Sequence, residues 1–272
     1  MAHTEGRFDT GADAWADYNQ GPLGRIRSEV TWHNLAPHLP AVTTLEPPPR
    51  VLDAGGGTGE LALRLVQAGY RVWLLDYAEA MLARAQQSAR DLPDQVRARL
   101  TFCHLAVDDA AQAFAPKFFD AITCHTLIEY LPDPQSTLAT LTGLLSEGGG
   151  LSVSFVNRHA QVLRQVWSRA DPAGALASLE DGTFCATLFD VPGMTYTAEE
   201  VSAWLIDLGL EVTATYGVRA FADFVPSEHF DDPRFLKALL SLELAVALRP
   251  PYNLVARYVQ LIARKSCVQD RP

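Results

Sequence analysis

The chain has 272 residues, of which 48% are hydrophobic, and its formal net charge is −10 at pH 7. This length and composition provide for a buried core in one enlarged α/β domain or two small ones, and they exclude a disordered chain. The negative charge disfavours non-specific binding to DNA or to an anionic membrane, although a local basic site remains compatible with it.

Targeting and metal-binding signals are also missing from the sequence. The longest apolar stretch, residues 236–248, is interrupted by Lys237 and Glu243, so we expect no membrane span. The first residues, MAHTEGRFD, contain an acid and no apolar core, which is not typical of a secretion signal. The cysteines are scattered without a Cys-x-x-Cys pair or a regular histidine spacing, so no metal site is predicted. We therefore expect a cytoplasmic protein without a structural metal.

The N-terminal part, residues 1–49, is predicted to stand outside the main sheet. Residues 12–38 have the pattern of one or two short helices. The proline-rich run TTLEPPPR at 43–50 then separates this part from the rest, because proline neither continues a helix nor donates to a sheet.

From residue 50 onward, apolar strands alternate with amphipathic helices. The predicted strands are residues 50–54, 70–76, 99–105, 118–127, 150–157, 210–218 and 253–264. The predicted helices between them are residues 58–69, 78–90, 134–145, 197–209 and 231–249, the fourth of which opens with a capping box, Thr197 and Glu200. Continuous apolar strands separated by helices predict an α/β fold with a mostly parallel seven-stranded sheet covered on both faces.

Residues 158–196 interrupt this alternation. They contain one helical stretch and then DGTFCATLFDVPGM, which is too long and too apolar for an idle connection. We predict a lid insertion here, between a core at 50–157 and the C-terminal part of the same sheet at 197–266, with residues 267–272 as a tail.

The stretch VLDAGGGTGE at 51–60 places four glycines within five positions directly after a predicted strand. Such a loop lets a ligand approach backbone N–H groups closely. The dinucleotide fingerprint would require glycine at position 60, where the chain has Glu60, and no Gly-Lys-Ser/Thr of a P-loop follows. The spacing found is Asp53, Gly55, Gly57, Gly59, which favours a cofactor without phosphates and with an amino acid end.

This arrangement resembles motif I of the class I S-adenosylmethionine-dependent methyltransferases, which have a Rossmann-like fold. By that resemblance, Asp53 and the glycines would hold the methionine part and the adjoining ribose. The family ends its second strand with an acid that binds the ribose hydroxyls, here Asp76, and has another beside the adenine after the third strand, here Asp108 or Asp109. Asp76 is also compatible with an N-cap role for the next helix, and the two roles are compatible with each other.

His125, at the end of the fourth strand, lies where a parallel sheet presents its C-terminal edge to ligands. Transfer from a sulfonium needs alignment and exclusion of water, and it needs a base only when the accepting atom carries a proton. As a base His125 would suit a phenol. As a neutral wall beside the cofactor, the interpretation we favour, it would suit any acceptor.

Over residues 20–265 the chain is similar to the bacterial tRNA 5-carboxymethoxyuridine methyltransferases, which esterify a carboxylate at the wobble uridine. The segments that carry the likeness are RVLDAGGGTGE, HTLIEYLPDP, YGVRAFADFVP and LLSLELAVALRPPYNLVARYVQLIARK. The resemblance implies that the N-terminal segment covers the cofactor. The residues that it assigns to the cofactor are Arg27 for the carboxylate, Gly55 and Gly56 for the backbone contact, Asp76 for the ribose, Val107 and Asp108 for the adenine, and His125 for the pocket wall.

An anionic acceptor requires a cation near the methyl group, and Arg219 is the candidate because a guanidinium matches two carboxylate oxygens. An ion pair with Asp223, four residues later, is the alternative. Asn157 and Tyr196 are weaker candidates for the same pocket.

The family's lysine-rich run ahead of the late capping-box helix is missing here, so tRNA binding would need Arg158, Arg164 and Arg169 in its place. The alternative is that these three arginines form an ordinary solvated face of a surface helix. The hypotheses are therefore a tRNA methyltransferase, a methyltransferase of a small carboxylate or hydroxyl compound, and a non-catalytic cofactor-binding module, each as a monomer or homodimer. The complete set of acids and glycines argues against the last.

Overall fold

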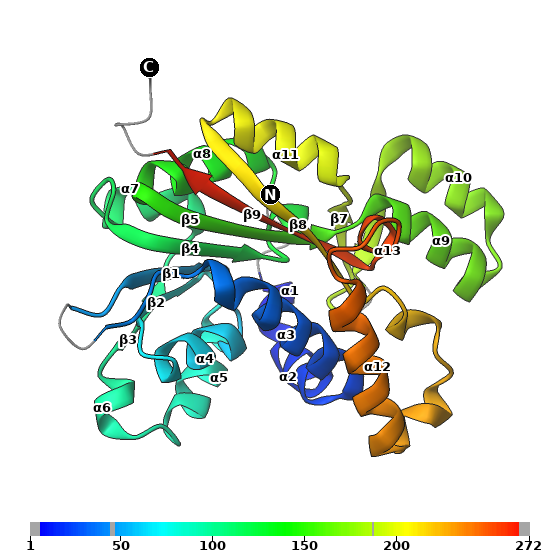
Figure 1. Ribbon diagram of the computed structural model, residues 1–272, viewed down its shortest axis with the longest axis horizontal. Coiled ribbons are helices and arrows are strands. Elements are labelled where there is room, and N and C mark those ends of the chain that lie inside the picture. Colours follow the sequence, from blue (N-terminus) through cyan, green and yellow to red (C-terminus); the bar gives the residue numbers. More distant parts are fainter. Residues whose placement is uncertain (1–5, 44–46, 187, 267–272) are drawn as a thin grey trace.

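The computed structural model describes residues 6–43, 47–186 and 188–266. Its centre is a seven-stranded sheet in the order β3-β2-β1-β4-β5-β9-β8 (Figure 1). The bounds of these strands are β1 Arg50–Ala54, β2 Arg71–Asp76, β3 Leu100–His104, β4 Phe119–His125, β5 Leu145–Val156, β8 Leu210–Val218 and β9 Tyr258–Lys265. Within this sheet β9 runs against its neighbours β5 and β8, and the other pairs are parallel, so the predicted mostly parallel sheet is confirmed.

Helices cover both faces of this sheet (Figure 1). On one face lie α4 (Glu60–Gln67), α5 (Glu79–Ala89) and the short α6 (Asp94–Arg97), and on the other lie α7 (Ala110–Ala113), α8 (Pro134–Leu144) and α11 (Ala198–Asp207). Alternate strand residues serve the two cores: Val51 packs with Leu65 on the first face, whereas Leu52 packs with Leu141 on the second. All four side chains are fully buried, as expected of a parallel sheet enclosed by two helical layers.

The N-terminal part forms α1 (Arg7–Thr10), α2 (Ala12–Gln20), α3 (Pro22–Leu35) and the 3₁₀ turn η1 (Ala36–His38). The break between α2 and α3 falls at Gly21, which is extended, and Pro22 then occupies the first turn of α3. Ile26 and Val30 of α3 join one apolar core with Val218 of β8 and Leu239 of α12 (Pro233–Val246). This packing brings the N-terminal helices to the edge of the sheet where the parallel strands end.

The insertion differs from the expected single helical stretch. It contains two helices, α9 (Arg158–Arg169) and α10 (Pro172–Asp181), followed by a hairpin of β6 (Thr183–Ala186) and β7 (Val191–Met194). The second helix begins because the Asp171 side chain caps the N–H of Gly174 and Pro172 fits the first turn. The two helices project from the right side of the molecule in Figure 1.

Two predicted strand starts are also displaced. β9 begins five residues later than expected, because Tyr252–Val255 forms the helical turn α13. β5 begins five residues earlier, at Leu145, and a register shift against β4 accommodates the extra residues. The capping box of α11 is present as predicted, with Thr197 and Glu200 each accepting from the other's backbone N–H. Within the described ranges, none of the helices is long and apolar enough to cross a bilayer.

Candidate cofactor and acceptor site

The glycine loop between β1 and α4 turns back against β2. The N–H groups of Gly55 and Gly56 both donate to the carbonyl oxygen of Leu75, at 2.8 and 3.1 Å. Gly57 has a φ of 54° and Gly59 a φ of 84°, in the left-handed region that glycine adopts without strain. A Cβ atom on Gly56 would lie 2.8 Å from a carboxylate oxygen of Asp53, so the loop has no room for a side chain there. As a result, the backbone of this loop is accessible to a ligand bound beside it.

Asp53 lies under this loop with one oxygen unused. It is buried, and its Oδ1 accepts from the hydroxyl of Thr123 at 2.7 Å, whereas Oδ2 has no hydrogen-bond partner among the described residues. Burial raises the pKa of Asp53 to about 6, with the nearby carboxylates of Glu60 and Asp76 adding to the increase. An unpartnered buried carboxylate is costly, so this atom is suited to a cationic donor supplied by a ligand.

A small cavity of about 90 Å³ opens beside Asp53. Its lining combines Asp53 with Arg27 of α3, Asn19 of α2 and His125 of β4. Arg27 donates to Asn19 Oδ1 at 2.8 Å, and its guanidinium lies 4.5 Å from the centroid of the Trp15 ring. A guanidinium and a carboxylate in one cavity fit the two charged ends of an amino acid.

A larger cavity of about 590 Å³ continues from the first, since Trp15, Gly55, Gly57 and Thr126 line both. Its polar groups include Asp76, whose oxygens accept from the N–H groups of Gly57 at 2.8 Å and Ala78 at 2.9 Å. Asp108 also lines it and accepts from Thr137 at 2.6 Å. The apolar lining comes from several elements: Phe8, Leu75, Met81, Val107, Leu127, Phe189 and Met194. Such a slot, with carboxylates at two strand ends, fits a ribose and a flat heterocycle.

The structure therefore brings together the predicted cofactor residues. Asp53, Gly55, Gly56, Gly57, Asp76, Val107, Asp108, Arg27 and His125 line one or both cavities. Gly59 lines neither cavity and forms the left-handed N-cap of α4, packed against Ala85 and Leu74. Asp109, the alternative to Asp108, is exposed and lines neither cavity.

His125 is held as a neutral ring. Its Nε2 lies 2.7 Å from the hydroxyl oxygen of Ser152, and the half-buried residue forms part of the wall of the small cavity. Burial, together with the positive charge of Arg27, lowers the pKa of His125 to about 3. A group with so low a pKa is a weak base at neutral pH, which supports the wall role over the base role.

Arg219 is buried and lines neither cavity. Its guanidinium pairs with Asp223 and donates to the hydroxyl of Tyr18. The ion pair expected as the alternative is therefore present. The Nε of Arg219 has no partner within the described part of the chain, so the pair does not satisfy the whole guanidinium.

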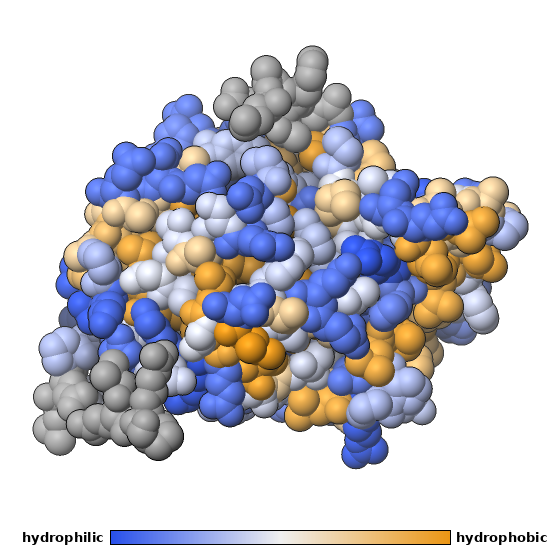
Figure 2. Space-filling view, turned by 90° about the horizontal axis from the view of Figure 1, so that it is seen from above, coloured by the Kyte–Doolittle hydropathy of each residue, from blue (hydrophilic) through white to orange (hydrophobic). Residues whose placement is uncertain are grey.

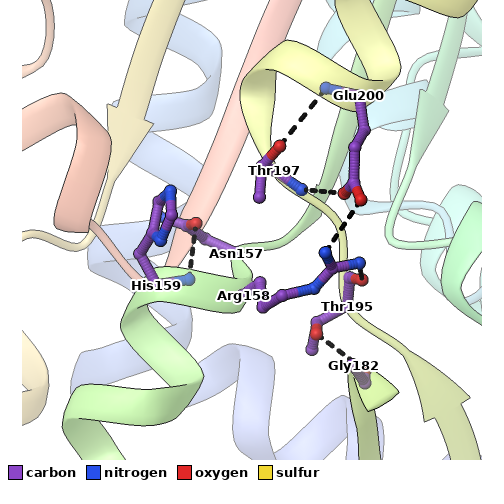
Figure 3. A network of polar contacts seen from close by, with 7 residues as sticks. All are labelled: Asn157, Arg158, His159, Gly182, Thr195, Thr197 and Glu200. Atoms are coloured by element: carbon purple, nitrogen blue, oxygen red, sulfur yellow. Dashed lines mark hydrogen bonds and ion pairs between the residues drawn. The ribbon is translucent and has the colours of Figure 1, made fainter. Parts of the chain in front are cut away.

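The other predicted acceptor residues make structural contacts, some of which Figure 3 shows for Asn157 and Arg158. Asn157 caps α9 through the N–H of His159, and its amide donates to the carbonyl oxygens of Leu254 and Ala256. Arg158 pairs with Glu200 at 2.8 Å and donates to the carbonyl oxygen of Thr195 (Figure 3). The ring of Tyr196 packs edge-on against Phe155 and Trp204. None of the three lines either cavity, and their role towards an acceptor stays a prediction.

Several lining residues were not predicted. Trp15 and Asn19 come from α2, and Phe189 from the hairpin, where the sequence carries no motif. Glu129 is different, because it belongs to the same HTLIEY segment as His125. It is buried, with Oε1 accepting from Val156 N at 2.9 Å and Oε2 without a partner among the described residues, and burial raises its pKa to about 7. Its position four residues after His125 was the signal available.

Known methyltransferases resemble the chain in sequence. The family model described as "Methyltransferase domain" matches residues 52–151. The tRNA 5-carboxymethoxyuridine methyltransferase of Escherichia coli K12 is 30% identical over 249 residues, which cover 91% of each chain. A ubiquinone biosynthesis O-methyltransferase of Leptothrix cholodnii is 30% identical over 169 residues, 62% of this chain and 67% of that one.

Solved structures resemble the fold. An S-adenosylmethionine-dependent methyltransferase of Thermotoga maritima superposes with a TM-score of 0.62 at 16% identity, covering 97% of this chain and all of that one. The magnesium protoporphyrin IX methyltransferase of Synechocystis, solved with bound S-adenosylmethionine, gives a TM-score of 0.54 at 18% identity over 92% of this chain and 83% of that one. At these identities the likeness is one of fold.

Proposed function

Because the chain belongs to the S-adenosylmethionine-dependent methyltransferases, in the family of the tRNA 5-carboxymethoxyuridine methyltransferase, we propose that it methylates the carboxylate of 5-carboxymethoxyuridine at the tRNA wobble position. S-Adenosylmethionine supplies a methyl group on a positively charged sulfur. The part proposed here is the acceptor, and it is supported by the charges of a cluster of arginines.

The residues present fit this cofactor. We assign its ammonium group to Asp53 Oδ2, the buried oxygen without a partner, and its carboxylate to Arg27. The ribose hydroxyls are assigned to Asp76, which keeps lone pairs free beyond its two backbone hydrogen bonds, and the adenine to Val107 and Asp108. In this assignment the two cavities hold the two ends of one molecule.

The observation that carries the acceptor proposal is an arginine cluster, which we define as Arg27, Arg164, Arg219 and Arg257. The hydroxyl of Tyr258 reports on its potential. Burial alone would raise the pKa of Tyr258, but Arg219, Arg257 and Arg27 outweigh burial and lower it. The cluster faces two carboxylates, Asp223 and Glu129, and Glu129 has a pKa of about 7. The region around the cluster therefore carries more positive than negative charge, which suits an anionic acceptor.

With such an acceptor, the residues of the chain need to bind and orient the substrate but need not remove a proton from it. A carboxylate has a pKa of about 4 and is already deprotonated at neutral pH, so it needs no base. This agrees with a neutral His125, whose pKa of about 3 leaves it unable to take a proton effectively. The cluster binds and orients the acceptor, while Phe8 and Phe189, whose ring centroids lie 4.8 Å apart, add apolar surface to the lining of the larger cavity.

A small hydroxyl acceptor is the second candidate, because of Glu129. Its unpartnered Oε2 is buried in the wall of the larger cavity, and a pKa of about 7 suits a general base for a hydroxyl group. The likeness to ubiquinone biosynthesis O-methyltransferases is compatible with such an acceptor. In that case the rate with a phenol should follow the ionisation of Glu129, whereas transfer to a carboxylate should not.

The test is methyl transfer to tRNA that carries 5-carboxymethoxyuridine. The enzyme and isotopically labelled S-adenosylmethionine are incubated with this tRNA, and wobble nucleosides are analysed by mass spectrometry. We expect one labelled methyl group on the wobble nucleoside, removed by mild alkali as an ester is. Unlabelled wobble nucleoside, with label transferred to a phenolic or small carboxylic compound instead, would exclude the tRNA proposal.

A further inference from the structure

Helix α9 connects the buried arginine cluster to an exposed aromatic side chain. Arg164 belongs to the arginine cluster and defines the inner end of a path along α9. Trp167 follows three residues later, on the next turn of the same helix, and defines its outer end. Trp167 is 73% exposed, the highest value among the large apolar side chains of the described residues. A tryptophan this exposed, directly beside a charged binding site, requires an explanation.

The inner end of this path has unsatisfied polar atoms. Arg164 Nε and Gln165 Oε1 are both shielded from solvent and have no hydrogen-bond partner within the described residues. Arg164 interacts electrostatically with Arg257, Asp223 and Arg219, so it belongs to the same charged region. A donor and an acceptor left open next to surplus positive charge are suited to a polar, anionic ligand.

The outer end offers a flat apolar surface. The indole of Trp167 makes a T-shaped contact with Phe224 of η4 (Ala222–Phe224), with ring centroids 5.5 Å apart, and most of the side chain remains exposed. Leu163 and Val166 extend the exposed apolar surface along α9. Figure 2 shows hydrophobic side chains gathered over this projecting part of the molecule, with hydrophilic ones beside them.

The charge of α9 indicates which kind of partner fits. The helix contains no acidic residue, and beyond Arg158, which is paired with Glu200, it carries Arg164 and Arg169, although the whole chain has a net charge of −10. The neighbouring α10 has exposed leucines as well, Leu176 and Leu179, but it ends in Glu180 and Asp181. A polyanion is therefore attracted to α9 and repelled by the end of α10.

We propose that Trp167 stacks on an unpaired base of the RNA substrate, with Arg164 one turn away in the arginine cluster and the exposed Arg169 contacting a phosphate. Base–aromatic stacking next to guanidinium groups is how proteins hold unpaired nucleotides. The inference rests on the proposed function, because a nucleotide whose carboxylate enters the arginine cluster leaves its neighbours in the strand to lie along α9. The chemical class of the ligand is a single-stranded RNA loop.

The test uses the full chain and a labelled anticodon stem-loop RNA with an unmodified wobble uridine, with affinity measured by fluorescence anisotropy. Trp167→Ala is expected to weaken binding about tenfold, since a stacked base is worth about 1 to 3 kcal/mol. Trp167→Phe should retain most of the affinity, because it keeps a ring. Trp167→Leu, which keeps apolar area without a π-face, should bind as weakly as Trp167→Ala.

Leu176→Ala is the matched control, because Leu176 is 62% exposed on the adjacent helix. It should leave RNA affinity unchanged. Equal affinity of Trp167→Ala and the wild type, wild-type affinity of Trp167→Leu, or equal losses in the Trp167→Ala and Leu176→Ala variants would overturn the proposal. So would sedimentation that shows a dimer lost in both alanine variants, because the surface would then bind protein.

The probe carries no carboxymethoxy group, so this result is independent of methyl transfer. If tRNA is not methylated but the stem-loop binds through Trp167, the proposed acceptor fails and the stacking site stands. If tRNA is methylated and Trp167→Ala binds the stem-loop normally, the stacking site alone is wrong.

Discussion

At the scale of single residues, the site depends on buried charged groups with atoms that have no hydrogen-bond partner among the described residues. Asp53 is the simplest case, since one oxygen is satisfied by Thr123 and the other has no partner among the described residues. Burial raises its pKa to about 6, so a fraction of the carboxyl group is protonated just below neutral pH. Only the ionised form attracts the ammonium group that we assign to it.

The affinity for S-adenosylhomocysteine should therefore fall as pH decreases from 7.5 through 6, approaching a tenfold loss per pH unit well below 6. Calorimetric titration at several pH values measures this. Asp53→Asn should bind weakly throughout and lose the pH dependence. A flat wild-type profile between pH 5 and 8 would remove Asp53 from the ammonium site.

The same raised pKa has the opposite effect on folding. Because the folded-state pKa of about 6 lies above the unfolded value of 3.8, stability contributed by Asp53 is present below pH 3.8 and lost as pH rises through 6. The free energy of unfolding of Asp53→Asn, measured relative to that of the wild type, should therefore be higher at pH 8 than at pH 4. Urea denaturation at both values checks this, and His125 does not interfere because both proteins contain it.

Arg219 needs a paired substitution to be tested. Removing the guanidinium alone would leave Asp223 buried without a partner, which costs about 3 to 5 kcal/mol. The double variant Arg219→Met, Asp223→Asn removes both charges and should fold. We expect it to lose most acceptor methylation by raising the acceptor KM, with unchanged S-adenosylhomocysteine affinity. Wild-type kinetics in the double variant would place Arg219 outside the acceptor site.

At the scale of elements, the loop between β1 and α4 can be tested with two glycines of similar backbone. Gly57 has a φ of 54° and lies between both cavities, whereas Gly209 has a φ of 80° and a Cβ atom there would have no neighbour within 4 Å. Gly57→Ala and Gly209→Ala should both lose about 1 kcal/mol of stability through backbone strain. Only Gly57→Ala should also weaken cofactor binding, because its methyl group enters the ligand's space. Equal cofactor affinity in the two variants would contradict this role of the loop.

Elements were predictable from the sequence where local pattern decides them. The strands at 50–54 and 70–76 and the cap at Thr197 follow from apolar runs and side-chain chemistry, and they are confirmed. The reversed direction of β9 and the early start of β5 depend on pairing between distant segments, which no local pattern contains. The second helix of the insertion was missed although Asp171 and Pro172 give a start signal for it.

The residues of the candidate site likewise divide into those named from the sequence and those that depend on tertiary packing. The resemblance to the methyltransferases assigned Asp53, Asp76 and either Asp108 or Asp109, and successive parallel strands that end at one edge of the sheet bring Asp53, Asp76 and Asp108 together. Trp15 and Asn19 were not predicted, because the face that α2 turns towards the cavity is set by how α2 and α3 pack on the sheet. Glu129 lies within a segment that was singled out from the sequence, but its burial, which raises its pKa, is visible only in the structure.

At the scale of the whole molecule, charge is unevenly organised. The chain is acidic overall, at −10, yet its arginine cluster and α9 gather positive charge at one place. A polyanion must therefore bind locally against a repulsive background. This arrangement favours a substrate with a few well-placed phosphates over non-specific binding along a nucleic acid.

The salt dependence of catalysis should reveal those contacts. If tRNA is the acceptor, its KM should rise steeply between low and physiological salt, because the logarithm of affinity falls by about 0.7 per phosphate contact for each unit of log salt concentration on a single strand. The KM for S-adenosylmethionine should stay nearly constant, since its site is enclosed. Arg169→Gln should reduce the tRNA slope by about one contact. Methylation of the free nucleoside in the same buffers serves as the control, and a tRNA KM as insensitive to salt as that of the nucleoside would show that no phosphates are bound.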